Sequence, residues 1–392
     1  MNNLYQGITV LLASAVTGER CKLPEGFSLE AALPVINKQN LVPLAFQGAL
    51  NCGISSKDPV MGKLMQRYLK LLVHSERQMR ALQQIFDALE ANKIDYLPLK
   101  GCQMKHLYPK PELRTMGDAD ILIREEQYSS LEPILESLGF TMAMESRYDY
   151  VWKREDLTVE MHRSLFPPTV QALCRYFGNG WNRAVRESGC RYRFSPEDTF
   201  VYQFAHMAKH YQISGIGSRH ILDLYVYLRA HPDLDEAYME AELEKLHLLA
   251  FYRNIRKVLK VWFENEAPDE ITEHITDFIF SGGSWGSVET GIYTDALRKS
   301  LEKGGIQNSR QRSVIQVIFP PAQAIETRYP VLKKAPWLLP VVWIARWLVV
   351  ILFRRRNIKK KMSIAAGASD EKVLARQQAL RYVGLDYEYN VE

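Results

Sequence analysis

A short segment in the first third of the chain combines buried strand patterns with two closely spaced carboxylates. Residues 97–124 read LPLKGCQMKHLYPKPELRTMGDADILIR. The apolar residues at both ends of this segment are typical of strands, and the glycine at position 101 allows a tight turn into a short helix. Asp118 and Asp120 are two residues apart, so strand periodicity places both side chains on one face of the second strand. The segment therefore predicts a sheet edge that carries two acids.

These two aspartates are candidate metal ligands. Two carboxylates on one face repel each other, and a divalent cation relieves that repulsion. Mg²⁺ prefers oxygen ligands and retains waters or substrate phosphates. The alternative is a D-x-D sequence in a polar turn, which also arises by chance.

The same segment resembles the polymerase-β-like nucleotidyltransferase superfamily. In that superfamily a glycine-started helix follows the first strand, an alternating strand supplies two acidic metal ligands, and a later strand supplies a third. More narrowly, LKG…LYP.P..R.MGDADILI followed by VEMHRSLF at 159–166 looks like the bacterial family of uncharacterised nucleotidyltransferases. The resemblance covers residues 97–166 and continues more weakly towards the C-terminus. One departure is that Lys100 and Gly101 stand where the broader superfamily has a glycine–serine pair.

The resemblance implies that a nucleoside monophosphate, AMP in the first instance, is moved from ATP or another nucleoside triphosphate to an acceptor hydroxyl, releasing pyrophosphate. Asp118 and Asp120 would hold Mg²⁺ or Mn²⁺, and a second ion would lie between them and a third carboxylate. The segment 157–162 alternates so that Glu160 and His162 share a face. Glu160 takes the third position, as a metal ligand or as the base for the attacking hydroxyl. His162 could be a second base, could bind nucleotide, or could only hydrogen-bond Glu160.

Lys100, Gly101 and Arg114 are candidates for contact with the phosphates of the nucleotide. A helix N-terminus behind a glycine exposes backbone N–H groups that suit an anion, and a lysine beside it can meet a phosphate as a point charge. The planar guanidinium of Arg114 could bind a phosphate or orient a carboxylate. The alternatives are a glycine that only allows the turn, a solvated lysine and a surface ion pair.

A second group of candidates lies on a helical segment that begins with the capping residue Ser195. His206 and His210 are four residues apart and share a helix face. Proteins similar to this chain carry an H..KH helix, then an arginine and an aspartate, which Arg219 and Asp223 match. Either these four residues close over the nucleotide from a second lobe, or they form a buried polar network that joins the helices.

The pattern as a whole predicts an α+β protein in which a small mixed β-sheet nucleotidyltransferase core lies between N-terminal and C-terminal helical regions. The glycine-rich segment 281–287 has no preceding strand and no GK[ST] sequence, so it is a linker or a substrate-side loop. The predicted divisions are an N-terminal helical region at 1–90, the catalytic core at 91–170, a helical domain at 171–330, and an apolar and basic helical tail at 331–392.

The tail contains PWLLPVVWIARWLVVILF at 336–353, which approaches the length that spans a bilayer. Arg346 near its middle would cost roughly 2.5–3.5 kcal/mol on insertion scales, so we expect a helix that is buried or lies on a membrane surface. Six basic residues follow within 354–361, although the net charge of the whole chain is only +5. The remainder is therefore close to neutral, which argues against long nucleic acid as a partner.

Five scattered cysteines without a C-x-x-C pair favour a reducing compartment, and the N-terminus lacks the basic start of a secretory signal. We therefore expect a cytoplasmic protein that could contact the inner membrane surface peripherally through 336–361. A small molecule, a glycan and a protein all remain open as the acceptor. The alternative functions are a non-catalytic nucleotide-binding or scaffold protein of a biosynthetic or toxin–antitoxin system, and a membrane-surface transferase. Because all three carboxylates are present, the enzyme is favoured.

Overall fold

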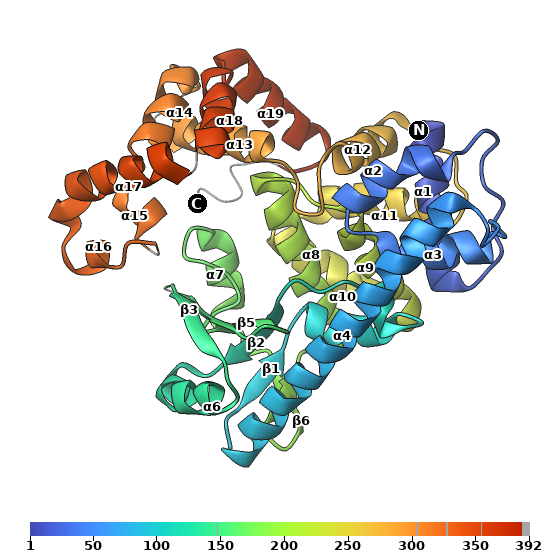
Figure 1. Cartoon of the computed structure of the whole chain (residues 1–392), viewed down its shortest axis with the longest axis horizontal. Coiled ribbons are helices and arrows are strands. Elements are labelled where there is room, and N and C mark those ends of the chain that lie inside the picture. Colours follow the sequence, from blue (N-terminus) through green and yellow to red (C-terminus); the bar gives the residue numbers. More distant parts are fainter. Residues whose placement is uncertain (147, 303–304, 327, 354, 386–392) are drawn as a thin grey trace.

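One mixed sheet of seven strands organises the molecule, and helices precede and follow it in the chain (Figure 1). The computed structural model describes residues 1–385, with gaps at 147, 303–304, 327 and 354. The strand order is β3-β4-β5-β2-β1-β7-β6. β2 pairs with β5 and β1 with β7 in parallel, whereas the other neighbours are antiparallel. The strands are β1 (Tyr96–Pro98), β2 (Ala119–Ile123), β3 (Thr141–Glu145), β4 (Asp149–Lys153), β5 (Thr158–His162), β6 (Val185–Ser188) and β7 (Arg191–Arg193). The predicted α+β class is confirmed.

The two faces of β2 belong to different cores. Ile121 and Ile123 are buried in a cluster with Ile85 and Phe86 of the long helix α4 (Pro59–Ala91). Leu122 points the other way, into the large core formed by the helical regions. Because side chains alternate along a strand, Asp120 lies on the same face as Leu122.

The N-terminal region consists of four helices. Asp58 caps the long helix α4, since its side chain accepts from the backbone N–H of Val60 at 2.7 Å. Figure 1 shows α4 running from the other N-terminal helices along the sheet. The remaining three helices are α1 (Asn3–Thr17), α2 (Leu29–Lys38) and α3 (Val42–Asn51).

Short helices fill the connections within the sheet. They are α5 (Gly101–Met104), η1 (Lys105–Leu107), η2 (Pro111–Leu113), η3 (Glu125–Ser130), α6 (Leu131–Ser137) and α7 (Gln171–Phe177). The pair β6 and β7 comes from the part of the chain for which the sequence predicted only helices, and it extends the sheet beside β1. The predicted domain boundaries themselves stay predictions.

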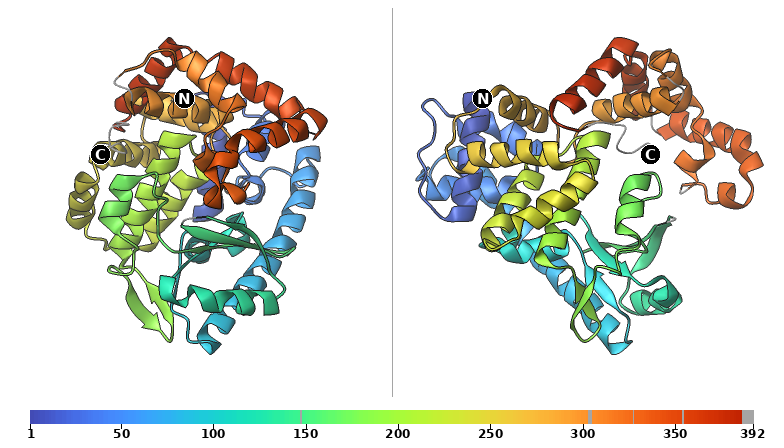
Figure 2. Two further views of the ribbon diagram at one scale, coloured as in Figure 1. Left: turned by 90° about the vertical axis from the view of Figure 1, so that its left-hand side faces the viewer. Right: turned by 180° about the vertical axis from the view of Figure 1, so that it is seen from behind.

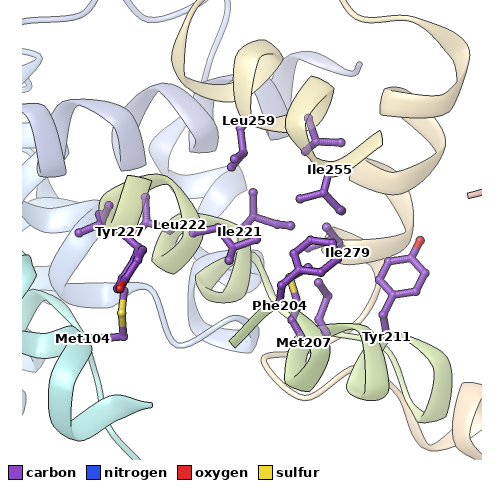
Figure 3. Packing of buried hydrophobic residues seen from close by; sticks show 14 of the residues in the cluster. Met104, Phe204, Met207, Tyr211, Ile221, Leu222, Tyr227, Ile255, Leu259 and Ile279 are labelled. Atoms are coloured by element: carbon purple, nitrogen blue, oxygen red, sulfur yellow. The ribbon is translucent and has the colours of Figure 1, made fainter. Parts of the chain in front are cut away.

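A bundle of helices packs against the face of the sheet that carries Leu122. In Figure 3, Phe204, Ile221, Ile255 and Ile279 meet in its apolar interior, and Met104 of α5 lies at the edge of the same cluster. Removing this apolar surface from water stabilises the arrangement of bundle and sheet. The helices are α8 (Pro196–Ile213), α9 (Ser218–Ala230), α10 (Glu236–Lys245), α11 (Leu249–Phe263) and α12 (Glu270–Ser281).

The C-terminal helices form an arm that lies on the other side of α8 from the N-terminal helices (Figures 1 and 2). Lys333 connects this arm to the sheet by donating to the backbone carbonyl of Glu145 at 3.2 Å. Among the described residues, no helix is both long and apolar enough to span a membrane. The elements are α13 (Val288–Glu302), α14 (Ser309–Ile318), α15 (Ala322–Ile325), α16 (Val331–Lys334), η4 (Pro336–Leu338), α17 (Leu339–Phe353), α18 (Arg355–Ala366) and α19 (Asp370–Tyr382).

Candidate active site

The parallel pairing of β2 with β5 brings the predicted acids together. Asp120 is the register partner of Glu160, and Leu122 is the partner of His162. Register partners in a ladder point to the same face of the sheet. Asp120, Glu160 and His162 therefore share the face that is turned towards α8.

The three side chains form a compact cluster. One ligand atom from each lies within 4.8 Å of the other two. His162 Nε2 is 2.9 Å from Asp120 Oδ1 and 3.5 Å from Glu160 Oε2. Lys100 donates to the same Asp120 oxygen at 2.6 Å. Asp118 lies directly before β2 and is not a member of this cluster. Asp118 and Asp120 both line a cleft between the sheet and helices α8 and α9.

The cluster contains more negative than positive charge when its acids are ionised. Burial and repulsion from Asp120 and Asp118 raise the pKa of Glu160 to about 8. Burial and Asp120 also raise the pKa of Asp118. Burial alone would raise the pKa of Asp120 too, but the Lys100 ammonium and the hydrogen bond to His162 hold it well below its ordinary value. The ammonium of Lys100 thus pairs with Asp120, one of the two acids of the cluster.

This donor set fits a divalent cation. Two carboxylates and one imidazole with ligand atoms within 4.8 Å of one another can reach one ion together. Carboxylates suit Mg²⁺ and Mn²⁺, and an imidazole is a better ligand for Mn²⁺ than for Mg²⁺. His162 Nδ1 is buried and has no hydrogen-bond partner among the described residues. The fit rests on charge and donor type.

The turn between β1 and α5 is tightly built. Lys100 adopts φ 43° and ψ −113°, a conformation that costs a non-glycine residue free energy and is found most often at functional sites. A Cβ atom on Gly101 would lie 2.9 Å from Nη1 of Arg114 and 3.2 Å from the side chain of Met116. Glycine at position 101 therefore allows the close approach of Arg114, and α5 is a single turn of four residues.

Arg114 and Asp223 form a buried bidentate pair between the sheet region and α9. Arg114 Nε and Nη2 donate to the two carboxylate oxygens of Asp223, both at 2.8 Å. Tyr108 donates to the same carboxylate at 2.7 Å. Of the alternatives raised for Arg114, the surface ion pair is excluded because the residue is buried. Arg114, Asp223 and Tyr108 thus form a buried polar network. Arg114 and Asp223 also line the cleft that contains Asp118 and Asp120.

The other predicted residues of the second lobe lie nearby. His206 Nε2 and His210 Nε2 are 3.3 Å apart, and burial together with neighbouring cations holds the pKa of both rings well below the usual value. Arg219 donates to the backbone carbonyl of Thr115 at 2.8 Å. His206 and Arg219 line the cleft with the acids, whereas His210 is not among its lining residues.

The cleft itself is narrow. It lies between the sheet and helices α8 and α9, and its volume is about 60 Å³. Typical small-molecule pockets are about 300–1,000 Å³, so a nucleoside triphosphate requires the side chains at its rim to move. Trp285 lies on this rim, 5.3 Å from the Arg219 guanidinium measured to its ring centroid.

Sequence reasoning missed Trp285 and Lys209. Trp285 belongs to the glycine-rich segment 281–287, so of the two alternatives for that segment the structure favours a substrate-side loop. Lys209 is buried on α8 and forms no ion pair with any residue that the structure describes. Burial, followed by repulsion from Lys100, lowers its pKa to about 7. The lysine of the H..KH pattern was the available signal.

Comparisons with known proteins relate the chain to a family. A family model described as uncharacterised nucleotidyltransferase matches residues 25–264, a range that contains the whole sheet and the cluster of acids. A comparison with curated proteins gives no match. The solution structure of the antibiotic-resistance factor ANT(2'')-Ia is 14% identical and covers 49% of this chain and 100% of its own, with a TM-score of 0.32.

Proposed function

The chain belongs to the family of uncharacterised nucleotidyltransferases, and from that premise we propose that it transfers AMP from ATP to an acceptor hydroxyl and releases pyrophosphate. The observation that carries this proposal is the register of Asp120 with Glu160, which gathers two carboxylates and His162 beside Lys100. Nucleotidyl transfer needs alignment of the reactants and neutralisation of phosphate charge more than covalent participation by the protein. The cluster offers groups for both tasks.

The acids serve as ligands and as acceptors of the proton. Asp118, Asp120 and Glu160 would hold Mg²⁺ or Mn²⁺, which when bound neutralises phosphate charge and lowers the pKa of the acceptor hydroxyl. Glu160 either completes this ligand set or accepts the proton of the attacking hydroxyl. Both roles need an ionised carboxylate. With a pKa of about 8, Glu160 can lose its proton close to neutral pH.

The cations serve the phosphates. Lys100 pairs with Asp120 at 2.6 Å, and its ammonium would meet the leaving pyrophosphate if a metal ion replaced it at that carboxylate. Two of the donor nitrogens of Arg114 are held by Asp223, and its Nη1 remains directed at the Gly101 turn. His206 and Arg219 line the cleft and His162 contacts Asp120, so these three residues are further candidates for contact with the nucleotide. His210 would act only through His206.

The test is incubation of the full chain with Mg²⁺ or Mn²⁺, a cell extract and each α-labelled nucleoside triphosphate. We expect label from ATP to enter one of the protein, lipid or small-molecule fractions. Asp118→Asn should abolish this label, because a neutral amide is a poor metal ligand, while the melting temperature stays close to that of the parent chain. Glu155→Gln, on the exposed turn before β5, is the matched control and should keep full activity. Transfer that survives in Asp118→Asn would refute the assignment.

A second candidate is a transferase that acts at a membrane surface. On η4 and α17, four apolar side chains at three- and four-residue spacing are 58 to 76% exposed: Trp337, Val341, Ile344 and Leu348. Lys333 and Lys334 flank this stripe, and such an arrangement suits an interfacial helix. Of the basic cluster that follows, residue 354 lies outside the described residues. A cytoplasmic location with contact at the inner membrane stays a prediction.

Sedimentation with vesicles separates this candidate from an enzyme that does not bind membranes. We expect the full chain to bind vesicles that contain anionic lipid, and Ile344→Glu to reduce that binding because a charge on the stripe opposes insertion. The control Glu155→Gln should bind like the parent. Equal recovery of Ile344→Glu and the parent chain with the vesicles would remove the membrane candidate.

A further inference from the structure

A second, larger cavity adjoins the cleft of the acids. It has a volume of about 420 Å³ and shares Met116, Gly117, Arg219 and Trp285 with the cleft as lining residues. None of Lys100, Gly101, Asp118 or Asp120 lines it. The turn at Lys100 and Gly101 and the two aspartates therefore border the cleft and not the larger cavity, and Gly117 borders both.

The two spaces differ in charge. Three aspartates and three permanent cations line the cleft, whereas no acidic residue lines the larger cavity. Its wall includes Arg67, Lys70 and His74, which stand three and four residues apart on α4 and so share one face of the helix. Arg219 adds a further guanidinium from α9. A ligand in this cavity would meet three permanent positive charges and one histidine.

These cations keep donors available. Arg67 donates to the side-chain oxygen of Asn37, and Arg219 uses Nη1 for Thr115. Among the residues that the structure describes, no carboxylate forms an ion pair with Arg67, Lys70 or Arg219. Guanidinium groups bind phosphate through two parallel N–H donors, which gives both affinity and orientation.

The remainder of the wall suits the body of a small organic molecule. Val42, Leu71 and the half-exposed ring of Trp285 supply apolar surface. The volume is within the range of small-molecule pockets and is too small for a folded protein. Gly117 lines both spaces, and the next residue, Asp118, lines the cleft. A ligand held in the larger cavity would therefore reach the cleft past Gly117.

We propose that this cavity, the acceptor pocket, binds a small acceptor that carries a phosphate group in addition to the hydroxyl that receives the nucleotide. The inference rests on the proposed function. The acceptor oxygen forms a bond to the α-phosphorus, the bond from that phosphorus to the bridging oxygen breaks, and the electron pair leaves with pyrophosphate. The hydroxyl proton passes to the carboxylate of Glu160 or to solvent. Arg67 and Lys70 hold the phosphate of the acceptor during this exchange, and Arg219 lines both spaces.

Binding is tested with inorganic phosphate as the probe, while Mg²⁺ and α,β-methylene-ATP fill the nucleotide site. Calorimetry should detect phosphate binding to the full chain, and Arg67→Gln/Lys70→Gln should weaken it about tenfold or more, because two charge-assisted contacts are lost. Both positions are exposed on α4, so this variant should fold. Lys63→Gln, exposed on the same helix and outside the pocket, is the control and should bind phosphate like the parent.

Two results of this titration would overturn the proposal. One is absence of phosphate binding, or phosphate binding that the double variant leaves unchanged. The other is a loss of affinity for α,β-methylene-ATP in the double variant as large as the loss for phosphate, which would assign the pocket to the nucleotide.

A transfer assay identifies the acceptor class. Small molecules from a cell extract are used before and after treatment with a phosphatase that is then removed. We expect label from ATP to enter the untreated small-molecule fraction and to be lost after treatment. Equal labelling of both samples, or label in protein or lipid alone, would refute the phosphorylated acceptor and leave nucleotidyl transfer intact. If no fraction is labelled but phosphate still binds the pocket, the proposed function fails instead.

Discussion

Replacing the buried lysine of α8 should make the protein more stable and less active. Lys209 is only 9% exposed and forms no ion pair with the described residues. Burial and repulsion from Lys100 lower its pKa from 10.5 to about 7. The folded protein therefore holds a group that is harder to protonate than in the unfolded chain, which is a cost to stability wherever the unfolded chain carries the proton.

The size of this cost follows from the two pKa values. A fall in the pKa from 10.5 to about 7 lowers the free energy of unfolding by about 4 to 5 kcal/mol at a pH where Lys209 is protonated in both states. At pH 7 the loss is about 4 kcal/mol. Lys209→Met keeps the length and apolar stem of the side chain and removes the charge. We expect the free energy of unfolding to rise by up to this amount at pH 7.

The pH dependence has a definite sign. Between pH 7 and 10.5 the unfolded chain binds more protons at position 209 than the folded protein, so the parent gains stability as the pH rises. The advantage of Lys209→Met should be constant below pH 7 and should vanish towards pH 10.5. Urea denaturation in EDTA at several pH values measures it, with Lys63→Met on an exposed site as the control.

Activity should change in the opposite direction. Lys100, Asp120 and Glu160 are among the charged groups that shift the pKa of Lys209, so a protonated Lys209 would add positive potential where charge develops on the phosphates. We expect nucleotidyl transfer by Lys209→Met to fall at least about tenfold.

A variant that is no more stable than its parent at pH 7, or whose gain in stability does not shrink with rising pH, would refute the reasoning about burial.

Three further predictions concern the acids and their partners. Glu160→Gln should abolish transfer and leave the melting temperature in EDTA at pH 7 unchanged or higher, because the amide replaces a carboxyl whose pKa is about 8; a large fall in the melting temperature would contradict this. For the same reason, Mg²⁺ binding must release a proton from Glu160 below pH 8, so calorimetry should show affinity rising about tenfold per pH unit up to pH 8 and levelling off above it. An affinity that is independent of pH would exclude Glu160 as a ligand. Asp223→Asn should destabilise the protein by about 3–5 kcal/mol in urea denaturation, since it leaves Arg114 buried without its counter-charge, and a loss below about 1 kcal/mol would show that water reaches the pair.

The strands that carry the acids could be predicted because their signal is local. Alternation over 157–162 places Glu160 and His162 on one face, and the structure has β5 at Thr158–His162 with that arrangement. The spacing of Asp118 and Asp120 predicted that both lie on one strand, whereas β2 contains Asp120 and begins one residue after Asp118. The cap at Asp58 and the start of α4 also depend on a few adjacent residues.

Features that depend on distant residues were not predictable. β6 is exposed along its whole length and contains charged residues, so it lacks the apolar alternation that indicates a strand, and only pairing with β7 defines it. Arg114 and Asp223 are 109 residues apart in the chain, and nothing near Arg114 indicates its partner. Only the folded structure shows that Trp285 borders the cleft.

The ion pair of Lys100 with Asp120 has a consequence for the stability of the protein without a metal ion. Clustered carboxylates repel one another unless a cation compensates their charge. In small zinc domains that cation is the metal itself, and its removal unfolds the domain. Here an internal counter-ion neutralises the most buried of the acids. The fold therefore keeps Asp120 paired without a metal ion, and we expect a chelator to abolish transfer without unfolding the protein.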